Sequence, residues 1–306
     1  MLHKGNITDV PNIEAGHFTD DVGKTGCTVV VCNGGAVCGV DVRGSAPGTR
    51  ETDLLKSENL VERVHAVVLS GGSAFGLESA CGVMDYLRDS GIGLDTGFAK
   101  VPIVPAAVLF DLGVGSPNAF PDKLAGYKAC KNASTDELPQ GRVGAGTGAT
   151  VGKALGAEFA QMGGIGTCSM SFSNGVIIGA LTAVNALGDV VDEKGSIIAG
   201  AYKDGFLNIR ESMKSAGETH GIKGANTTIG VLATNAKLTK VQANKLASVC
   251  QDGLAMSIRP CHTMYDGDTY FAMSTGDVEM DFTRLCSLAA ECVSKSIENA
   301  VRAAND

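Results

Sequence analysis

Short runs of β-branched apolar residues alternate with longer segments that carry apolar residues at helical spacing, and this alternation constrains the fold most strongly. Strands that alternate with helices build sheets covered by helices, so the sequence predicts an α/β protein. The predicted strands are Cys27–Cys32, Ala36–Val42, His65–Leu69, Gly175–Asn185, Thr227–Ala233 and Thr269–Met273. The predicted helices are Thr52–Arg63, Ala74–Asp89, Lys123–Asn132, Lys240–Ser257 and Phe282–Ala303.

The last predicted helix shows the clearest amphipathic pattern. Its apolar residues recur at steps of three or four, which places them in one stripe along the helix. These residues are Phe282, Leu285, Ala289, Val293, Ile297 and Val301. Before the preceding helix, Thr239 stands where a side-chain hydroxyl can cap the first turn.

No repeat, low-complexity tract or proline-rich linker divides the chain, so residues 1–306 are predicted to form a single α/β domain. The apolar stretch Asn174–Asp192 predicts a long strand or strand pair that ends at a turn inside a sheet. The polar stretch Asp204–Asn226 interrupts the pattern and is the one place where a flexible connection is expected.

Charge and hydropathy exclude two classes of partner. The net charge is −8, and the 25 basic residues are scattered, which disfavours a nucleic-acid partner. No window reaches the roughly 18 apolar residues that a membrane span needs, and the start of the chain has no apolar stretch of signal-peptide length. We therefore expect a cytoplasmic protein that binds neither nucleic acid nor membrane.

Ten cysteines occur without a CxxC pair, mostly within apolar segments, which predicts buried, reduced thiols. The five histidines are isolated from one another, and His262 beside Cys261 is the only adjacency of possible ligands. A zinc site needs four ligands, so one pair is too few. The sequence predicts neither a metal nor a cofactor.

Two glycine-rich segments resemble known motifs but fail their spacing. The stretch GAGTGATVGK at 144–153 has Thr147 where a phosphate loop needs glycine and Ala154 where it needs serine or threonine. The stretch SGGSAFG at 70–76 has Phe75 where a nucleophile elbow around Ser73 needs glycine. Close backbone packing beside a site is expected for the first segment, and helix capping or pocket lining for the second.

The segment GANTTIGVLATNAKLTK at 224–240 carries more information, because two threonines open a strand directly after a polar connection. A cut before Thr227 would leave a new amine at the edge of a rigid sheet. Such a residue has a hydroxyl nucleophile and an amine whose unperturbed pKa is about 8. The amine can act as the base that accepts the hydroxyl proton. The alternative is that Thr-Thr only begins a β-strand, which threonine favours.

A second polar cluster lies downstream, where Asp266 and Asp268 flank Gly267 before a predicted strand. Two carboxylates this close can orient an ammonium or hydroxyl group, and their mutual repulsion separates their pKa values. The alternative is an ordinary Asp-Gly turn between strands.

Seven ordered motifs resemble the DmpA-like family of peptidases, whose relatives include β-peptidyl aminopeptidases and the nylon-oligomer hydrolase. The motifs are ITDVPNIEAGHFTD at 7–20, TGCTVV at 25–30, DVRGSAPGTRETDLL at 41–55, LSGGSAFGLESACGVMDYL at 69–87, GAGTGATVGK at 144–153, AVNALGDV at 183–190 and NTTIGVLATNA at 226–236. The resemblance implies an αββα sandwich, maturation by self-cleavage before a serine or threonine, and hydrolysis of amide bonds in peptides or related oligomers. It also implies a homo-oligomer of processed pairs.

Site residues follow from the same resemblance, position by position. The nucleophile is the threonine of the Asn226–Thr227 junction, and Asn185 lies near the reacting carbonyl, where its amide donates to an oxyanion. Lys153 matches a lysine found near the nucleophile in nylon-oligomer hydrolases. Asp266 and Asp268 match the acidic pair of the threonine-bearing branch of the family.

The resemblance therefore predicts an amidohydrolase, an aminopeptidase acting on a peptide or small amide, which cuts itself into residues 1–226 and 227–306. Two alternatives stay open: acyl transfer of the ornithine-acetyltransferase type, and an unprocessed binding protein. The choice among L-, D-, β-aminoacyl and synthetic amide substrates also stays open.

Overall fold

A nine-stranded sheet organises residues 3–215 and 226–306, which the computed structural model describes. Its strands follow the order β10-β11-β14-β16-β2-β4-β7-β3, and β1 pairs with β2 beside this path. Their bounds are β1 (Glu14–Asp20), β2 (Thr25–Val42), β3 (Gly48–Arg50), β4 (Arg63–Ser70), β7 (Ala106–Val108), β10 (Ile165–Ser171), β11 (Ile177–Asn185), β14 (Thr227–Ala236) and β16 (Thr269–Val278).

Helices and three small sheets complete the described part of the chain. The helices are α1 (Ser79–Asp89), α2 (Lys123–Lys131), α3 (Ile209–Ser215), α4 (Lys240–Ser257) and α5 (Phe282–Asn305). The small sheets pair β5 (Leu94–Asp95) with β6 (Lys100–Val101), β8 (Thr150–Val151) with β9 (Gln161–Met162), and β12 (Asp189–Val191) with β13 (Ile197–Ala199) and β15 (Ile258–Arg259).

Strand β2 divides the large sheet into two layers. Its first half, Cys27–Val31, pairs with β4, whereas Val37–Val42 pairs with β16. The register shifts between Val31 and Ala36, where Gly35 has a φ of +74° that favours glycine. The sequence predicted two separate strands here, but the break is an irregularity inside one strand. One strand therefore belongs to both layers.

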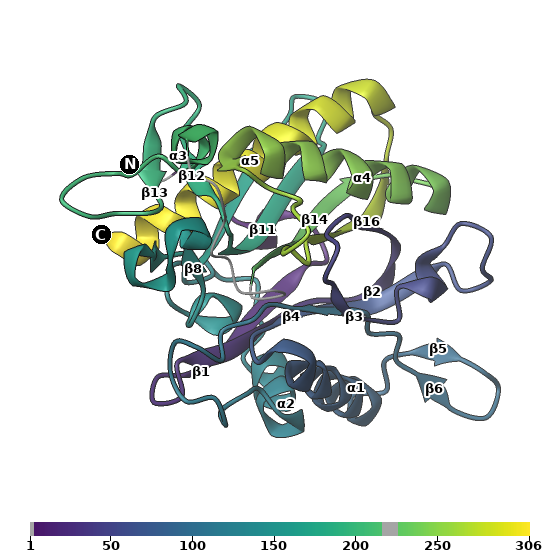
Figure 1. Ribbon diagram of the computed structural model, residues 1–306. Helices are drawn as coiled ribbons and strands as arrows, with labels where there is room; N and C mark the ends of the chain where they lie inside the picture. The colour runs from purple at the N-terminus through teal and green to yellow at the C-terminus, as the bar shows by residue number, and fades with distance from the viewer. Residues whose placement is uncertain (1–2, 216–225) are drawn as a thin grey trace.

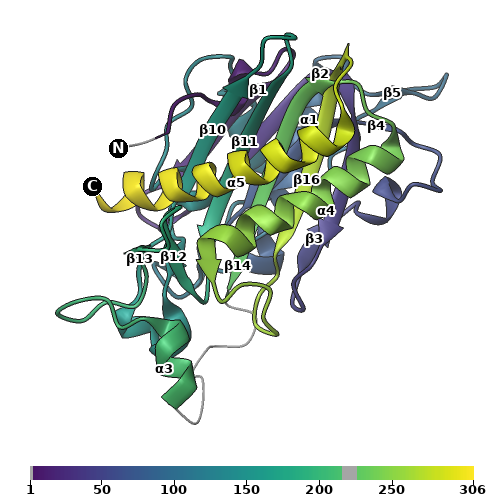
Figure 2. The ribbon, with the colours of Figure 1, turned by 90° about the horizontal axis from the view of Figure 1, so that it is seen from above.

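Figure 1 shows four layers from top to bottom, two of helices and two of strands. Apolar cores lie between successive layers. The first core joins α4 and α5 to one sheet layer, and the two helices run side by side across it (Figure 2). The second core, with Leu69, Leu181 and Phe271, lies between the sheet layers. The third joins α1 and α2 to the other layer. This arrangement confirms the predicted αββα sandwich.

The helices predicted from apolar spacing are largely confirmed. Helices α2, α4 and α5 match their predicted ranges within two residues, and Thr239 forms a capping box with Gln242 at the start of α4. In α5 every residue of the predicted stripe from Leu285 to Val301 is buried. The predicted helix Ala74–Asp89 begins instead as a 3-10 turn, Ser73–Glu78, and becomes α-helical at Ser79.

The predicted helix Thr52–Arg63 is wrong, because only Asp53–Leu55 forms a short 3-10 turn. The backbone carbonyls of this loop point to a distant partner instead of to their own helix. Lys240 of α4 donates from Nζ to the carbonyls of three loop residues, Leu54, Asn59 and Val61, at 3.0, 2.7 and 2.9 Å. The Lys240 ammonium group, which is distant in sequence, therefore replaces the helical hydrogen bonds.

Replacing Lys240 with methionine is expected to lower the free energy of unfolding by roughly 1–3 kcal/mol, because three part-buried carbonyls lose their donor. Urea denaturation of the purified variant measures this loss. The control is Lys245→Met on the exposed side of the same helix, which should change stability by less than about 0.5 kcal/mol. Equal stability of the two variants would show that the ammonium contributes nothing to holding the loop.

The apolar stretch Asn174–Asp192 forms two strands, as one of the predicted options had it. Strand β11 lies inside the large sheet between β10 and β14, and β12 enters a small sheet. The polar stretch that was expected to be a flexible connection contains α3, whose first amide, on Ile209, donates to Asp189 at 2.7 Å. Within that stretch, residues 216–225 lie outside the described residues.

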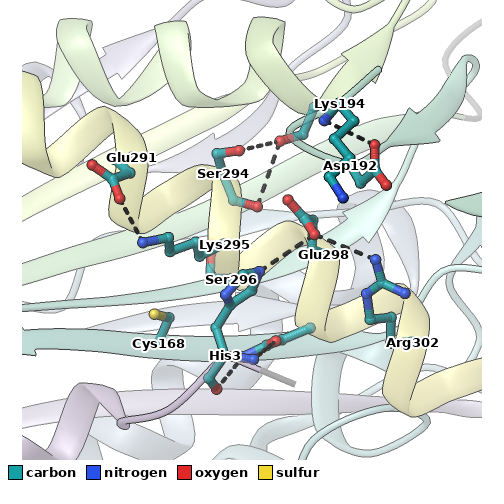
Figure 3. A network of polar contacts seen from close by, with 12 residues as sticks. His3, Cys168, Asp192, Lys194, Glu291, Ser294, Lys295, Ser296, Glu298 and Arg302 are labelled. Carbon is teal, nitrogen blue, oxygen red and sulfur yellow. Dashed lines mark hydrogen bonds and ion pairs between the residues drawn. The ribbon is translucent and has the colours of Figure 1, made fainter. Parts of the chain in front are cut away.

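The start of the described chain is tied to the C-terminal half of α5 (Figure 3). The His3 backbone amide donates to Asn299 Oδ1 at 2.7 Å, and Asn299 Nδ2 donates back to the His3 carbonyl at 2.9 Å. The His3 ring lies 3.3 Å from Glu298, which also pairs with Arg302 at 3.5 Å. The first described residue, His3, is thus held on the last helix of the chain.

All ten cysteines are unpaired; seven are buried, as predicted for most of them, and three are partly exposed. Within residues 3–215 and 226–306, no group of three or more His, Cys, Asp or Glu side chains could hold a metal ion. Within the same residues, no helix combines the length and the apolar character needed to cross a bilayer.

Candidate functional site

The predicted nucleophile lies where three central strands meet. Thr227 is the first residue of β14 and pairs with Asn185, the last residue of β11. On the other side β16 runs parallel to β14, so the loop that leads into β16 reaches the same end of the sheet. Figure 1 shows β11, β14 and β16 side by side. Residues 185, 227 and 266–268 therefore converge although they are distant in sequence.

The Asn226–Thr227 junction is buried. Asn226 and Thr227 are 1% and 3% exposed, so solvent hardly reaches the hydroxyl. The Thr227 hydroxyl donates to the Asn226 carbonyl oxygen, and the Gly267 backbone amide donates to the same oxygen at 3.0 Å. A backbone N–H already in contact with this oxygen is placed to stabilise negative charge that develops there.

Gly267 lies so close to the nucleophile that a side chain does not fit. A Cβ atom at this position would lie 2.7 Å from Thr227 Oγ1 and 2.6 Å from the Ala46 carbonyl oxygen. Gly267→Ala is expected to displace the hydroxyl and to slow cutting at residue 227 roughly 10–100-fold, since small misplacements of reacting groups cost that much. The rate of fragment appearance on a denaturing gel measures the effect.

A matched control for this variant is Gly113→Ala, because a Cβ at Gly113 meets no atom within 4 Å. The control should be cut as fast as the wild type. If Gly267→Ala is also cut at the wild-type rate, the close packing of residue 267 against the hydroxyl does not matter for the reaction.

The Asp268 carboxylate accepts three hydrogen bonds from two residues, Thr228 and His262. Its Oδ1 accepts the Thr228 amide at 2.7 Å, and its Oδ2 accepts the His262 amide at 3.1 Å and His262 Nδ1 at 2.8 Å. The carboxylate is 2% exposed. It therefore fixes the backbone immediately after Thr227.

Asp266 lies next to the Asn226–Thr227 junction, because its backbone forms a parallel β-bridge with Asn226. Its Oδ2 accepts the Thr263 amide and hydroxyl at 2.7 and 2.6 Å. Burial, together with the negative charge of Asp268, raises the pKa of the Asp266 carboxyl. The backbone amide of Ala46 donates to the Asp266 carbonyl at 2.9 Å and holds this loop in place.

Lys153 and Asn185 form a hydrogen-bonded pair, in which Asn185 is buried and Lys153 is partly buried. Lys153 Nζ donates to Asn185 Oδ1 at 2.7 Å and lies 3.3 Å from its backbone oxygen. Asn185 Nδ2 donates to the Phe110 carbonyl at 3.0 Å, which orients the amide. Burial lowers the pKa of Lys153 to about 7, although the charges of Asp266 and Asp111 oppose the shift. A lowered pKa favours the neutral amine, which is the form that a general base requires.

Asp111 is a buried carboxylate that the sequence analysis did not single out. It accepts the Thr25 hydroxyl and the Gly72 amide, each at 2.7 Å, and burial raises its pKa. A Cβ at Gly71 would lie 2.1 Å from its Oδ2. The glycines after β4 thus allow close backbone packing against Asp111 rather than forming a nucleophile elbow.

The glycine-rich segment 144–153 also packs closely, as expected. A Cβ at Gly148 would lie 2.2 Å from the Lys24 carbonyl and 2.9 Å from Asp111 Cβ. The segment ends at Lys153, so its tight course delivers the lysine to Asn185. The structure therefore brings together all the predicted site residues and adds two that were missed, Asp111 and His262. The adjacency of Cys261 and His262 was noted in the sequence, but nothing there indicated its partner Asp268.

Comparison with known proteins gives a consistent picture. The model of peptidase family S58 matches residues 5–306. An uncharacterized aminopeptidase of Mycobacterium leprae is 41% identical over 292 residues, covering 91% of this chain and 80% of that protein. A 6-aminohexanoate-oligomer endohydrolase of Paenarthrobacter ureafaciens is 32% identical over 282 residues, covering 90% and 76%.

Solved structures agree with the fold. A β-aminopeptidase of Burkholderia sp. superposes with a TM-score of 0.73 at 20% identity, covering 100% of this chain and 89% of that one. The L-aminopeptidase D-Ala-esterase/amidase of Ochrobactrum anthropi, described as a variant of the Ntn hydrolase fold, gives 0.75 at 20% identity with the same coverage.

Proposed function

The chain belongs to peptidase family S58 and is a hydrolase of amide bonds, and from this premise we propose that it is a self-processing aminopeptidase with Thr227 as its nucleophile. One observation supports this most directly. The Thr227 hydroxyl contacts the carbonyl group of the preceding residue, and a backbone amide, Gly267 N–H, donates to the same oxygen. A nucleophile and an oxyanion donor therefore meet at one peptide bond.

In the cutting step, Thr227 Oγ1 forms a bond to the Asn226 carbonyl carbon, and the bond between that carbon and the Thr227 nitrogen breaks. We assign Lys153 as the base that accepts the hydroxyl proton, and the departing nitrogen takes up a proton as it becomes an amine. The product is an ester between Asn226 and the Thr227 side chain. Water hydrolyses it to give residues 1–226 and residues 227–306 with a free N-terminal threonine.

The cut is also what opens the site. In the uncut chain the junction is almost fully buried, so no substrate amide reaches the hydroxyl. The Asn226 carboxamide is buried without a hydrogen-bond partner among the described residues, a cost of about 1–3 kcal/mol. Cleavage adds a carboxylate to Asn226 beside Asp266, and like charges repel. The unsatisfied carboxamide and the repulsion from Asp266 both favour movement of Asn226 away from Thr227 after the cut.

In the mature enzyme, Thr227 attacks the carbonyl of a substrate amide and its own α-amine transfers the proton. We assign Asn185 as an oxyanion donor, and Asp266 and Asp268 as the groups that orient the amine and the backbone of β14. The acyl-enzyme ester is then hydrolysed. The substrate is a peptide or small amide, and no cofactor takes part in these steps.

We further propose one α/β domain over residues 1–306, in which the two segments stay associated after the cut. The strand order supports this, because β14 and β16 of the smaller segment lie between β11 and β2 of the larger one. Unpaired cysteines accord with a cytoplasmic location. A homo-oligomer of processed pairs is proposed by analogy with the family, and light scattering of the processed protein tests it.

A substrate panel tests the proposed activity. Processed protein is incubated with L-, D- and β-aminoacyl amides and 6-aminohexanoate oligomers, and separately with N-acetylornithine and glutamate. Release of free amine from at least one amide is expected. Acetyl transfer to glutamate without any amide hydrolysis would instead assign the chain to acyl transfer.

A further inference from the structure

His262 has no role in the reaction proposed above, but it contacts the site through Asp268. His262 Nδ1 lies 2.8 Å from Asp268 Oδ2, and its backbone amide donates to the same oxygen at 3.1 Å. Its Nε2 lies 3.4 Å from the Gln251 carbonyl of α4. The ring is therefore positioned between a helix and the carboxylate that fixes Thr228.

The backbone at His262 is shaped for this contact. His262 has a φ of +55°, in the left-handed region that non-glycine residues seldom adopt. This conformation accompanies the approach of both its backbone N–H and its ring to one carboxylate oxygen. The His262 and Asp268 side chains are 17% and 3% exposed, so water screens the pair only weakly.

The pair also carries charge. Burial opposes protonation of His262, but hydrogen bonds and charges from Asp268 and Cys261 outweigh it and raise its pKa to about 10. The other group that faces the ring is the neutral Gln251 carbonyl of α4. A cationic ring offsets part of the Asp268 charge, and that charge acts on Asp266, whose pKa it raises.

We propose that His262 is a positioning residue of this site: its two N–H donors and its positive charge fix Asp268 against the Thr228 amide and set the charge balance around Thr227. This inference rests on the proposed function. Without the cation, the cluster becomes more negative and every proton-binding group in it holds its proton more tightly. Loss of a nearby positive charge favours the protonated form of a base in the cluster, so cutting would require a higher pH.

His262→Asn separates charge from hydrogen bonding. Asparagine adopts positive φ readily and keeps a side-chain N–H donor, but it carries no charge. The midpoint of the rate of cutting against pH is expected to move upward by roughly one pH unit. His262→Leu, which lacks the donor as well, should be cut still more slowly. Met264→Asn, at an exposed residue of the same loop, is the control and should keep the wild-type profile.

A wild-type pH profile for His262→Asn would overturn the inference while leaving the proposed function intact. If the wild type itself is not cut, the proposed function fails, and an NMR titration of the full-length Thr227→Ala chain still decides the role of His262. There, an imidazolium signal that persists at pH 8 with a hydrogen-bonded Nδ1 proton supports the inference. A ring that is neutral at pH 7 contradicts it.

Discussion

Thr227→Ala is expected to leave the chain as one 31.2 kDa polypeptide and to abolish amide hydrolysis. The variant removes the only atom that can attack the Asn226 carbonyl in the proposed step, and it equally removes the nucleophile of the mature enzyme. The expected loss in both reactions is at least about 10⁴-fold, the scale seen when a catalytic nucleophile is deleted. Gel electrophoresis and an amide-hydrolysis assay measure the two effects.

The neighbouring threonine supplies a matched control. Thr228 is buried and its hydroxyl has no hydrogen-bond partner among the described residues, so Thr228→Val keeps the shape and the backbone bond to Asp268. This variant should be cut and active. Thr227→Ser should also be cut, because it retains a hydroxyl. Full amidase activity in an uncut Thr227→Ala chain would contradict the account.

Lys153→Met is expected to slow cutting by about 10²–10⁴-fold, the usual contribution of a positioned acid or base. Methionine fills the partly buried space without a charge, so the fold should persist. The wild-type rate should rise with pH through about 7, because the lysine accepts a proton only when it is neutral and its pKa is lowered to about 7. The methionine variant should lose this rise.

Timed gels across pH 5 to pH 9 measure the rate of cutting of the wild type and of Lys153→Met. Lys245→Met is the control for removal of a lysine. A Lys153→Met chain that is cut at the wild-type rate with the wild-type pH profile would exclude the lysine as the base. A slow variant that retains the rise through neutral pH would assign the titration to another group.

The parts of the fold that depend on local pattern were predictable from the sequence. Helix α5 follows from apolar spacing alone, since its stripe from Leu285 to Val301 packs on the sheet. The Thr52–Arg63 segment was not predictable in this way, because Lys240, far along the chain, satisfies its carbonyls. The division of β2 between two layers likewise depends on partners that are distant in sequence.

The residues of the candidate site were likewise only partly predictable from local sequence pattern. A Thr-Thr pair at the start of a strand does not by itself distinguish a nucleophile from a strand residue, and the family resemblance supplied that distinction. The missed residues depend on long-range contacts: Asp111 is held by Thr25 and Gly72, which are 86 and 39 residues away. His262 lies six residues from Asp268, but only the turn between them brings their side chains together.

Intact-mass analysis of the purified protein, combined with N-terminal sequencing, tests the central claim most directly. The account predicts two chains, residues 1–226 and 227–306, with the smaller one beginning Thr-Thr-Ile-Gly. A single uncut chain that hydrolyses amides at full rate would contradict it.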